Sequence, residues 1–226
     1  MSEADVIDSH PLRLLEEQTG LHKAEFGLIL ARSGVGKSAA LINFGLGAVL
    51  KDKQVLHFSA GMASEKVHQY YQEIHKKLTD HHPGSGDISW EKVYHQFMVI
   101  SYSDSRRMVE DLENEIQTLL NNVQIKPHLI LVDGLDVDDH AEKNLARLAQ
   151  IAQSFDIKML VSMRIHRNAD GDIDLEGPLK IARESTEHVY LLEALNGRIH
   201  LEFISRDQKK DLPIYFCPND FIFKLT

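Results

Sequence analysis

Eight consecutive residues, from Ala31 to Ser38, limit the possible folds of this chain more than any other part of the sequence. They read ARSGVGKS. This string matches a phosphate-binding P-loop, in which four variable residues separate a first glycine from Gly-Lys-Ser, except that Ala31 replaces the first glycine. An apolar run, FGLILA from Phe26, precedes the string, and a segment with apolar residues at helical spacing follows it. The sequence therefore predicts a strand, a phosphate-binding loop and a helix in succession.

Each part of this loop has an expected role. The glycines let backbone N–H groups surround phosphate oxygens, and the positive end of the following helix attracts their negative charge. Lys37 is expected to reach the β- and γ-phosphates, and the Ser38 hydroxyl to bind Mg²⁺. ATP with Mg²⁺ is the expected ligand, although no residue spacing identifies the base. The residues predicted to bind the nucleotide are Ser33, Gly34, Val35, Gly36, Lys37, Ser38 and Ala39.

Further apolar runs alternate with segments of helical periodicity. Strands are predicted at 53–59, 97–102, 127–132 and 158–163, and helices at 38–50, 63–78, 104–121 and 140–155. Apolar strands separated by helices predict an α/β fold, with a mostly parallel sheet covered on both faces. After about residue 185, short strands at 188–192, 199–204, 214–217 and 221–224 predict a C-terminal antiparallel extension. We expect a lead-in over 1–20 and one nucleotide-binding domain over 21–226.

A carboxylate at the end of another buried strand would complete the site. Asp133 directly follows the apolar run LILV, and ligands of open α/β sheets lie at the carboxyl ends of strands. Asp133 is therefore the second predicted Mg²⁺ residue, acting through water. The alternative is that Asp133 only opens a turn with Gly134, because Asp-Gly is also a turn sequence. The carboxylates that follow, Asp136, Asp138 and Asp139, are expected in a loop or at a helix cap.

Composition narrows the functional classes. A formal charge of −9 opposes loose binding to nucleic acid, which depends mainly on Lys and Arg contacts to phosphates. Nucleic-acid contact is possible but not favoured. The single cysteine, Cys217, is expected to be buried and fits a reducing cytoplasm. No apolar run is long enough for a membrane span, and the 13 histidines lack the spacing of a metal site.

Four strings together resemble a known family: FGLILARSGVGKSAALINF, VLHFSAGM, LILVDGLD and KMLVSMRIHR. In order and spacing they are similar to the RecA-like ATPases, and most similar to replicative DNA helicases and circadian-clock ATPases. The resemblance extends over about residues 12 to 225, and it implies a RecA-like core that binds ATP and Mg²⁺. It also implies assembly into a homo-oligomer or binding to a protein partner.

The chain departs from this family at its catalytic positions. A glutamate usually follows the second strand, where it orients or deprotonates the attacking water, but Gly61 stands there and Glu65 is the nearest substitute. Arg164 replaces the glutamine that senses the γ-phosphate. In the late strand, Arg206 takes the place of a lysine that reaches a neighbouring subunit, and Gln208 takes the place of the accompanying arginine.

These departures favour one of three functional hypotheses. Because a general base contributes about 10² to 10⁴ in rate and an arginine finger about 10³ to 10⁵, losing both leaves binding nearly intact and hydrolysis slow. The first hypothesis is thus a nucleotide-dependent switch or scaffold subunit with weak ATPase activity. The second is an oligomeric DNA-dependent ATPase. The third is a small-molecule P-loop kinase, with Arg164 and Arg167 as lid residues.

Overall fold

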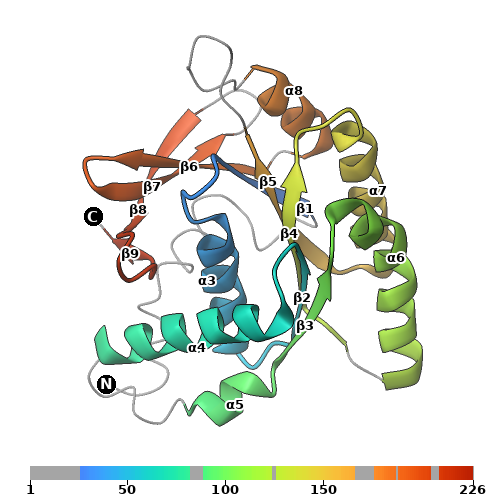
Figure 1. Cartoon of the computed structure of the whole chain (residues 1–226), viewed down its shortest axis with the longest axis horizontal. Helices are drawn as coiled ribbons and strands as arrows, with labels where there is room; N and C mark the ends of the chain where they lie inside the picture. The colour runs from blue at the N-terminus through green and yellow to red at the C-terminus, as the bar shows by residue number, and fades with distance from the viewer. Residues whose placement is uncertain are drawn as a thin grey trace.

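The computed structural model describes residues 26–81, 89–123, 126–165, 176–186, 188–204 and 209–225. Within these ranges, one nine-stranded sheet runs through the molecule in the order β3-β2-β4-β5-β1-β6-β7-β8-β9 (Figure 1). Its strands are β1 (Phe26–Ala31), β2 (Val55–Ala60), β3 (Phe97–Tyr102), β4 (Leu129–Asp136), β5 (Lys158–Arg164), β6 (His188–Leu195), β7 (Arg198–Ile204), β8 (Lys209–Phe216) and β9 (Lys224–Leu225).

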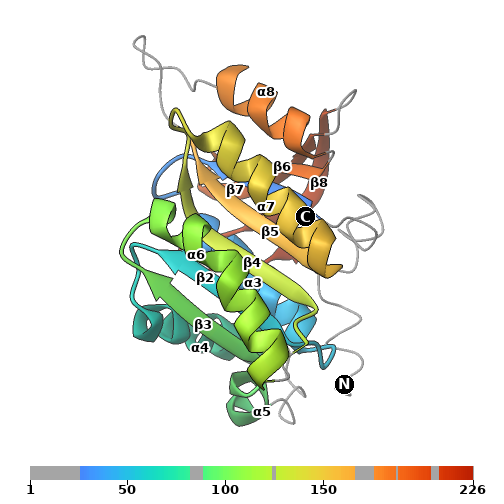
Figure 2. The same cartoon turned by 90° about the vertical axis from the view of Figure 1, so that its right-hand side faces the viewer.

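Helices cover both faces of this sheet. On one face lie α3 (Lys37–Val49), α4 (Ser64–His81) and the short α5 (Trp90–Tyr94), and these helices share one hydrophobic cluster. On the other face lie α6 (Ser105–Thr118), with a π-helical extension (Leu119–Val123), α7 (Ala141–Phe155) and α8 (Glu176–Ser185). Figure 2 shows α6, α7 and α8 side by side across this second face. The predicted α/β fold with a sheet covered on both sides is confirmed.

Most predicted elements exist, with three differences. First, β6 pairs parallel with β1, so the antiparallel extension begins at β7 and not at residue 188. Second, α8 was not predicted, because Gly177 and Pro178 suggest a turn; proline is nevertheless tolerated in the first turn of a helix. Third, β8 begins at Lys209, although the prediction began after Pro213. Pro213 lies where the β7–β8 register shifts, an irregularity that accommodates a proline.

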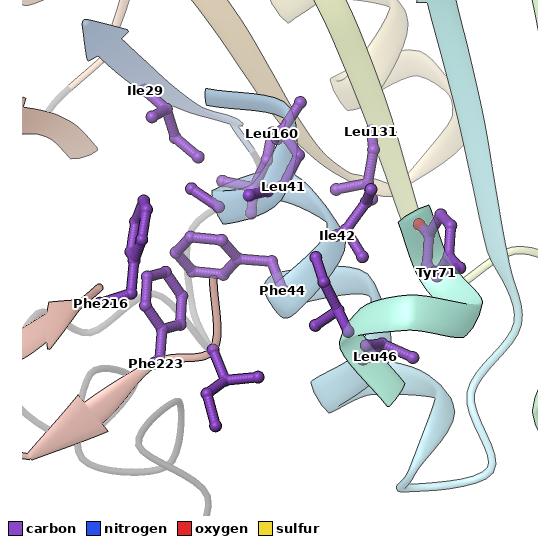
Figure 3. Close-up of a cluster of buried hydrophobic side chains, with 14 of the residues drawn as sticks. Ile29, Leu41, Ile42, Phe44, Leu46, Tyr71, Leu131, Leu160, Phe216 and Phe223 are labelled. Carbon is purple, nitrogen blue, oxygen red and sulfur yellow. The ribbon is translucent and has the colours of Figure 1, made fainter. Parts of the chain in front are cut away.

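A close contact between α3 and α4 fixes the layer that carries the P-loop. α3 is buried on nearly all sides, between the sheet, α4 and the C-terminal strands (Figure 3). A Cβ atom at Gly45 would lie 2.5 Å from Tyr71 Oη and 3.0 Å from Leu131 Cδ1. A glycine inside a helix costs about 1 kcal/mol relative to alanine, but only glycine lets Tyr71 of α4 pack this closely on α3.

Candidate functional site

The predicted P-loop connects β1 to α3 with an open helix start. α3 begins at Lys37 after Gly36, whose φ of 102° places it in the left-handed region. No side chain caps this helix start, and its first turn carries no acidic residue. The first N–H groups of the helix therefore remain available to an anion. Gly36 is also sterically required, because a Cβ atom there would lie 2.9 Å from the Phe216 ring.

The Lys37 side chain folds back along the loop. Its Nζ donates hydrogen bonds to the carbonyl oxygens of Ala31, at 3.3 Å, and Arg32, at 3.2 Å. Burial lowers the pKa of Lys37, and the negative charge of Asp133 partly opposes this shift. The ammonium group therefore lies in a partly desolvated position where attraction to an anion is stronger than in water.

Asp133 lies on the neighbouring part of the same sheet edge. It is buried and accepts a hydrogen bond from Ser162 Oγ on β5. Gly134 N in turn donates to Ser162 Oγ at 3.2 Å. Gly134 has a φ of 100°, and a Cβ atom there would lie 2.7 Å from the Ala60 carbonyl oxygen. The Asp-Gly pair thus forms an irregularity inside β4 and does not end the strand.

Asp136 and Arg164 form an ion pair at the ends of β4 and β5. Arg164 Nε lies 2.6 Å from Asp136 Oδ1, and Arg164 Nη2 lies 2.7 Å from Oδ2. The expectation that Asp136 lies in a loop or caps a helix was wrong, because β4 continues beyond Gly134 and places Asp136 in register with Arg164. The signal was missed because the apolar run stops at Val132. Asp138 does accept a hydrogen bond from His140 N, directly before α7.

One cavity of about 530 Å³ brings most of the predicted residues together. The P-loop contributes Ser33, Gly34, Gly36, Lys37, Ser38 and Ala39, and the strand ends contribute Ala60, Gly61, Met62, Asp133, Gly134, Leu135, Asp136 and Arg164. Of the other predicted residues, Val35 is buried in the core, and Glu65 is exposed in the first turn of α4 and does not line the cavity. Arg206, Gln208 and Arg167 lie outside the described residues.

A second wall of this cavity was not predicted from the sequence. Tyr70, Glu73, Ile74 and Lys77 line it from α4, and Phe221 lines it from the C-terminal turn between β8 and β9. The apolar and charged residues of α4 alternate as in any amphipathic helix, so their positions carry no separate signal. The related expectation that Cys217 is buried was wrong, because Cys217 in the same turn is only half-buried.

Buried polar side chains lie in the sheet beside Asp133. Ser59 on β2 is the register partner of Asp133, and His57 lies two residues earlier on the same face. His57 Nδ1 is 3.2 Å from Tyr71 Oη. In the described part of the chain, His57 Nε2 and Ser59 Oγ have no hydrogen-bond partner. Burial lowers the pKa of His57 from 6.5 to about 4, so this histidine is neutral at pH 7.

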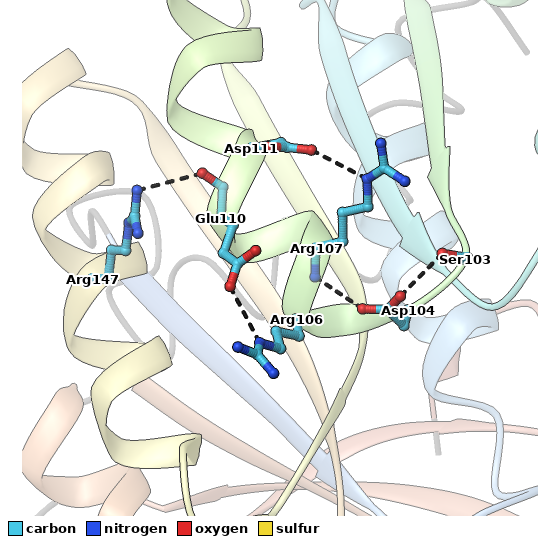
Figure 4. Close-up of polar contacts among 7 residues, drawn as sticks. All are labelled: Ser103, Asp104, Arg106, Arg107, Glu110, Asp111 and Arg147. Carbon is cyan, nitrogen blue, oxygen red and sulfur yellow. Dashed lines mark hydrogen bonds and ion pairs between the residues drawn. The ribbon is translucent and has the colours of Figure 1, made fainter.

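Other clusters considered from the sequence have structural roles. Arg106 and Arg107 pair with Glu110 and Asp111 one turn further along α6, and Arg107 N donates to the capping residue Asp104 (Figure 4). These arginines are therefore already paired with carboxylates. Over the described ranges, no group of three His, Cys, Asp or Glu side chains is placed to hold a metal ion. None of the described helices has the length and apolar character that crossing a membrane requires.

Comparison with known proteins identifies the fold. A solved structure, the ATPase domain of a replicative helicase, is similar to this chain with a TM-score of 0.63 and 13% sequence identity. The match covers 89% of this chain and 84% of that chain. No protein-family model matches the sequence, and no curated protein matches it. The chain therefore has the RecA-like P-loop fold that the sequence predicted.

Proposed function

We propose that this protein binds a nucleoside triphosphate with Mg²⁺ and acts as a nucleotide-dependent switch or scaffold with weak hydrolysis. One observation carries this proposal: a single cavity joins the uncapped start of α3, Lys37 and Asp133. Backbone N–H groups and an ammonium group suit the phosphates. The Ser38 hydroxyl and the Asp133 carboxylate, which line the same cavity, are oxygen ligands of the kind that Mg²⁺ prefers.

Weak hydrolysis is proposed from the residues near the expected γ-phosphate. Gly61 lines the cavity where the family has its glutamate, and Glu65 lies off the cavity. Among the described residues, the carboxylates that line the cavity are Asp133, Asp136 and Glu73. Asp133 is allotted to Mg²⁺, Asp136 is paired with Arg164, and Glu73 lies on α4, away from the strand ends. None of them replaces the missing general base in our proposal.

Arg164 is assigned the role of reading the γ-phosphate. It lines the cavity together with Lys37 and affects the pKa of that lysine through its charge. A guanidinium group binds carboxylate and phosphate oxygens with the same planar pair of N–H groups. In this proposal, Arg164 exchanges Asp136 for the γ-phosphate, so the ends of β4 and β5 report whether a triphosphate is bound.

A DNA-dependent ATPase is the second candidate, because the similar fold in the comparison belongs to an ATPase domain. In that case the chain assembles with copies of itself, and Arg206 is its inter-subunit finger. Arg206 remains a prediction from the sequence, as does the cytoplasmic location.

Calorimetry and turnover on the purified chain separate these candidates. We expect ATP to bind in the presence of Mg²⁺, and ATP turnover to stay slow with or without single-stranded DNA. Molecular mass in solution is measured with and without ATP. Fast, DNA-stimulated turnover by a ring-sized oligomer would replace the switch with the second candidate. Absence of binding to both ATP and GTP would refute nucleotide binding altogether.

A further inference from the structure

The outer end of the cavity has a composition unlike that of its phosphate end. Tyr70 and Ile74 of α4 form one wall, and Phe221 of the C-terminal turn lines the cavity with them. Two charged residues of α4, Glu73 and Lys77, lie among these apolar groups. An apolar pocket with a few polar groups is the usual form of a small-molecule site. This end therefore suits a flat, partly polar group better than it suits phosphates.

Hydrogen bonds from two helices hold the C-terminal turn in place. Asn43 of α3 is buried, and its Nδ2 donates to the Phe221 carbonyl oxygen at 2.6 Å. Its Oδ1 accepts from Phe223 N at 3.1 Å. Lys77 Nζ of α4 donates to the Asn219 carbonyl oxygen at 2.8 Å. The turn is thus tied to both α3 and α4, which fixes the position of Phe221 relative to the wall of α4.

Phe221 has an unusual backbone conformation. Its φ is 55°, in the left-handed region, which a bulky residue rarely adopts. A Cβ atom at Gly36 would lie 3.7 Å from Phe221 Cδ1, so the Phe221 ring lies beside the P-loop. Strained residues persist only where surrounding contacts impose them, and they are concentrated at functional sites. Here the Asn43 bonds impose a conformation that places an aromatic ring in the cavity.

We propose that this outer end is a nucleobase subsite for an amino-bearing purine, which rests on the proposed binding of a nucleoside triphosphate. The Phe221 ring provides a stacking surface, because any base offers a π face to an aromatic side chain. Glu73 has no hydrogen-bond or ion-pair partner among the described residues, and its carboxylate can only accept hydrogen bonds when ionised. It therefore favours a base that offers an exocyclic amino group, such as adenine, over hypoxanthine, which has a carbonyl group there.

Calorimetry with Mg²⁺ and three ligands tests this subsite: ATP, inosine triphosphate and inorganic tripolyphosphate. We expect the wild-type chain to bind ATP about fivefold more tightly than inosine triphosphate, because Glu73 gains one hydrogen bond to a charged acceptor. The Glu73→Gln variant should remove this preference, because an amide can also donate to the carbonyl group of hypoxanthine. Asp80→Asn is the matched control, since it removes the same charge from an exposed residue of α4 outside the cavity.

Stacking is tested separately at Phe221. Phe221→Leu should weaken ATP binding about tenfold, in line with the loss of one base–ring stack, and should change tripolyphosphate binding less than about twofold. Phe221→Tyr keeps the ring and should retain the affinity for ATP, which separates stacking from damage to the turn. Tyr94→Leu changes an exposed aromatic residue on α5 and serves as the control.

The outcomes distinguish this inference from the function on which it rests. If no ligand binds, including tripolyphosphate, the proposed function fails. If all three ligands bind with one affinity, and neither Glu73→Gln nor Phe221→Leu changes their ratios, the phosphate site stands and the base subsite is refuted. Tighter binding of inosine triphosphate than of ATP would also refute it.

Discussion

The two ends of the cavity are built from different materials. The phosphate end consists of the P-loop backbone and the strand ends, and its cations, Lys37 and Arg164, face the carboxylates Asp133 and Asp136. The outer end consists of side chains from α4 and a strained turn near the C-terminus. The first arrangement follows from the edge of a parallel sheet, whereas the second depends on individual side chains. Affinity for phosphate and selection of a base should therefore be separable by mutation.

The largest expected effect is at Lys37. Lys37→Ala should raise the dissociation constants for ATP and tripolyphosphate alike, by about 100-fold, because it removes a partly desolvated cation that bonds to phosphate. Calorimetry measures both constants. Lys53→Ala removes the same charge from an exposed residue and should leave both unchanged. If Lys37→Ala weakened ATP but not tripolyphosphate binding, the division of the cavity into two ends would be wrong.

The buried polar groups beside the phosphate end predict an effect of pH on stability. The pKa of His57 is about 4 when folded and 6.5 ordinarily, so below pH 6.5 the unfolded chain binds a proton that the folded chain does not. Stability must therefore fall as the pH falls through this window, and this group contributes a loss of about 2 kcal/mol between pH 7 and pH 5.

Urea unfolding at pH 7 and pH 5 measures this loss. His57→Gln, which keeps a partner for the Tyr71 hydroxyl, should reduce the difference between the two pH values by about 2 kcal/mol. His95→Gln, at an exposed histidine, should not change it. An unchanged difference in the His57 variant would mean that His57 is not held neutral beside Asp133.

How much of the site could be predicted depended on how local its signal is. The P-loop is a local pattern, so its strand, turn and helix start were predicted to within a residue. Asp133 was found because it ends an apolar run. Asp136 was misplaced because its role depends on register with Arg164 across the β4–β5 pair, which periodicity does not reveal. Phe221 was missed for the same reason, since Asn43 contacts it across 178 residues of sequence.

The Asn43 bonds predict a smaller effect that concerns the outer end. Asn43→Ala should lower the free energy of unfolding by about 1.5 kcal/mol, because it leaves buried backbone groups of the C-terminal turn unpaired. The dissociation constant for ATP should rise a few-fold while that for tripolyphosphate stays constant. Urea unfolding and calorimetry measure the two effects. Asn114→Ala, at an exposed asparagine of α6, is the control. Equal weakening of both ligands would show that the turn supports the phosphate end as well.

The smallest expected effect concerns the ion pair between Asp136 and Arg164. Both side chains are about two-fifths exposed, so water screens their attraction and the pair contributes less than about 1 kcal/mol. If Arg164 must leave Asp136 to reach a γ-phosphate, Asp136→Asn should raise the preference for ATP over ADP by about threefold. Arg164→Gln should lower this preference.

The ratio of the two dissociation constants is the informative measurement, because a general change in charge affects ATP and ADP together. Asp139→Asn removes the same charge from an exposed residue beyond β4 and should leave the ratio unchanged. If Asp136→Asn and Arg164→Gln also leave it unchanged, Arg164 does not read the γ-phosphate. The ion pair would then only join the ends of β4 and β5, and the phosphate end would distinguish ligands no better than the P-loop alone.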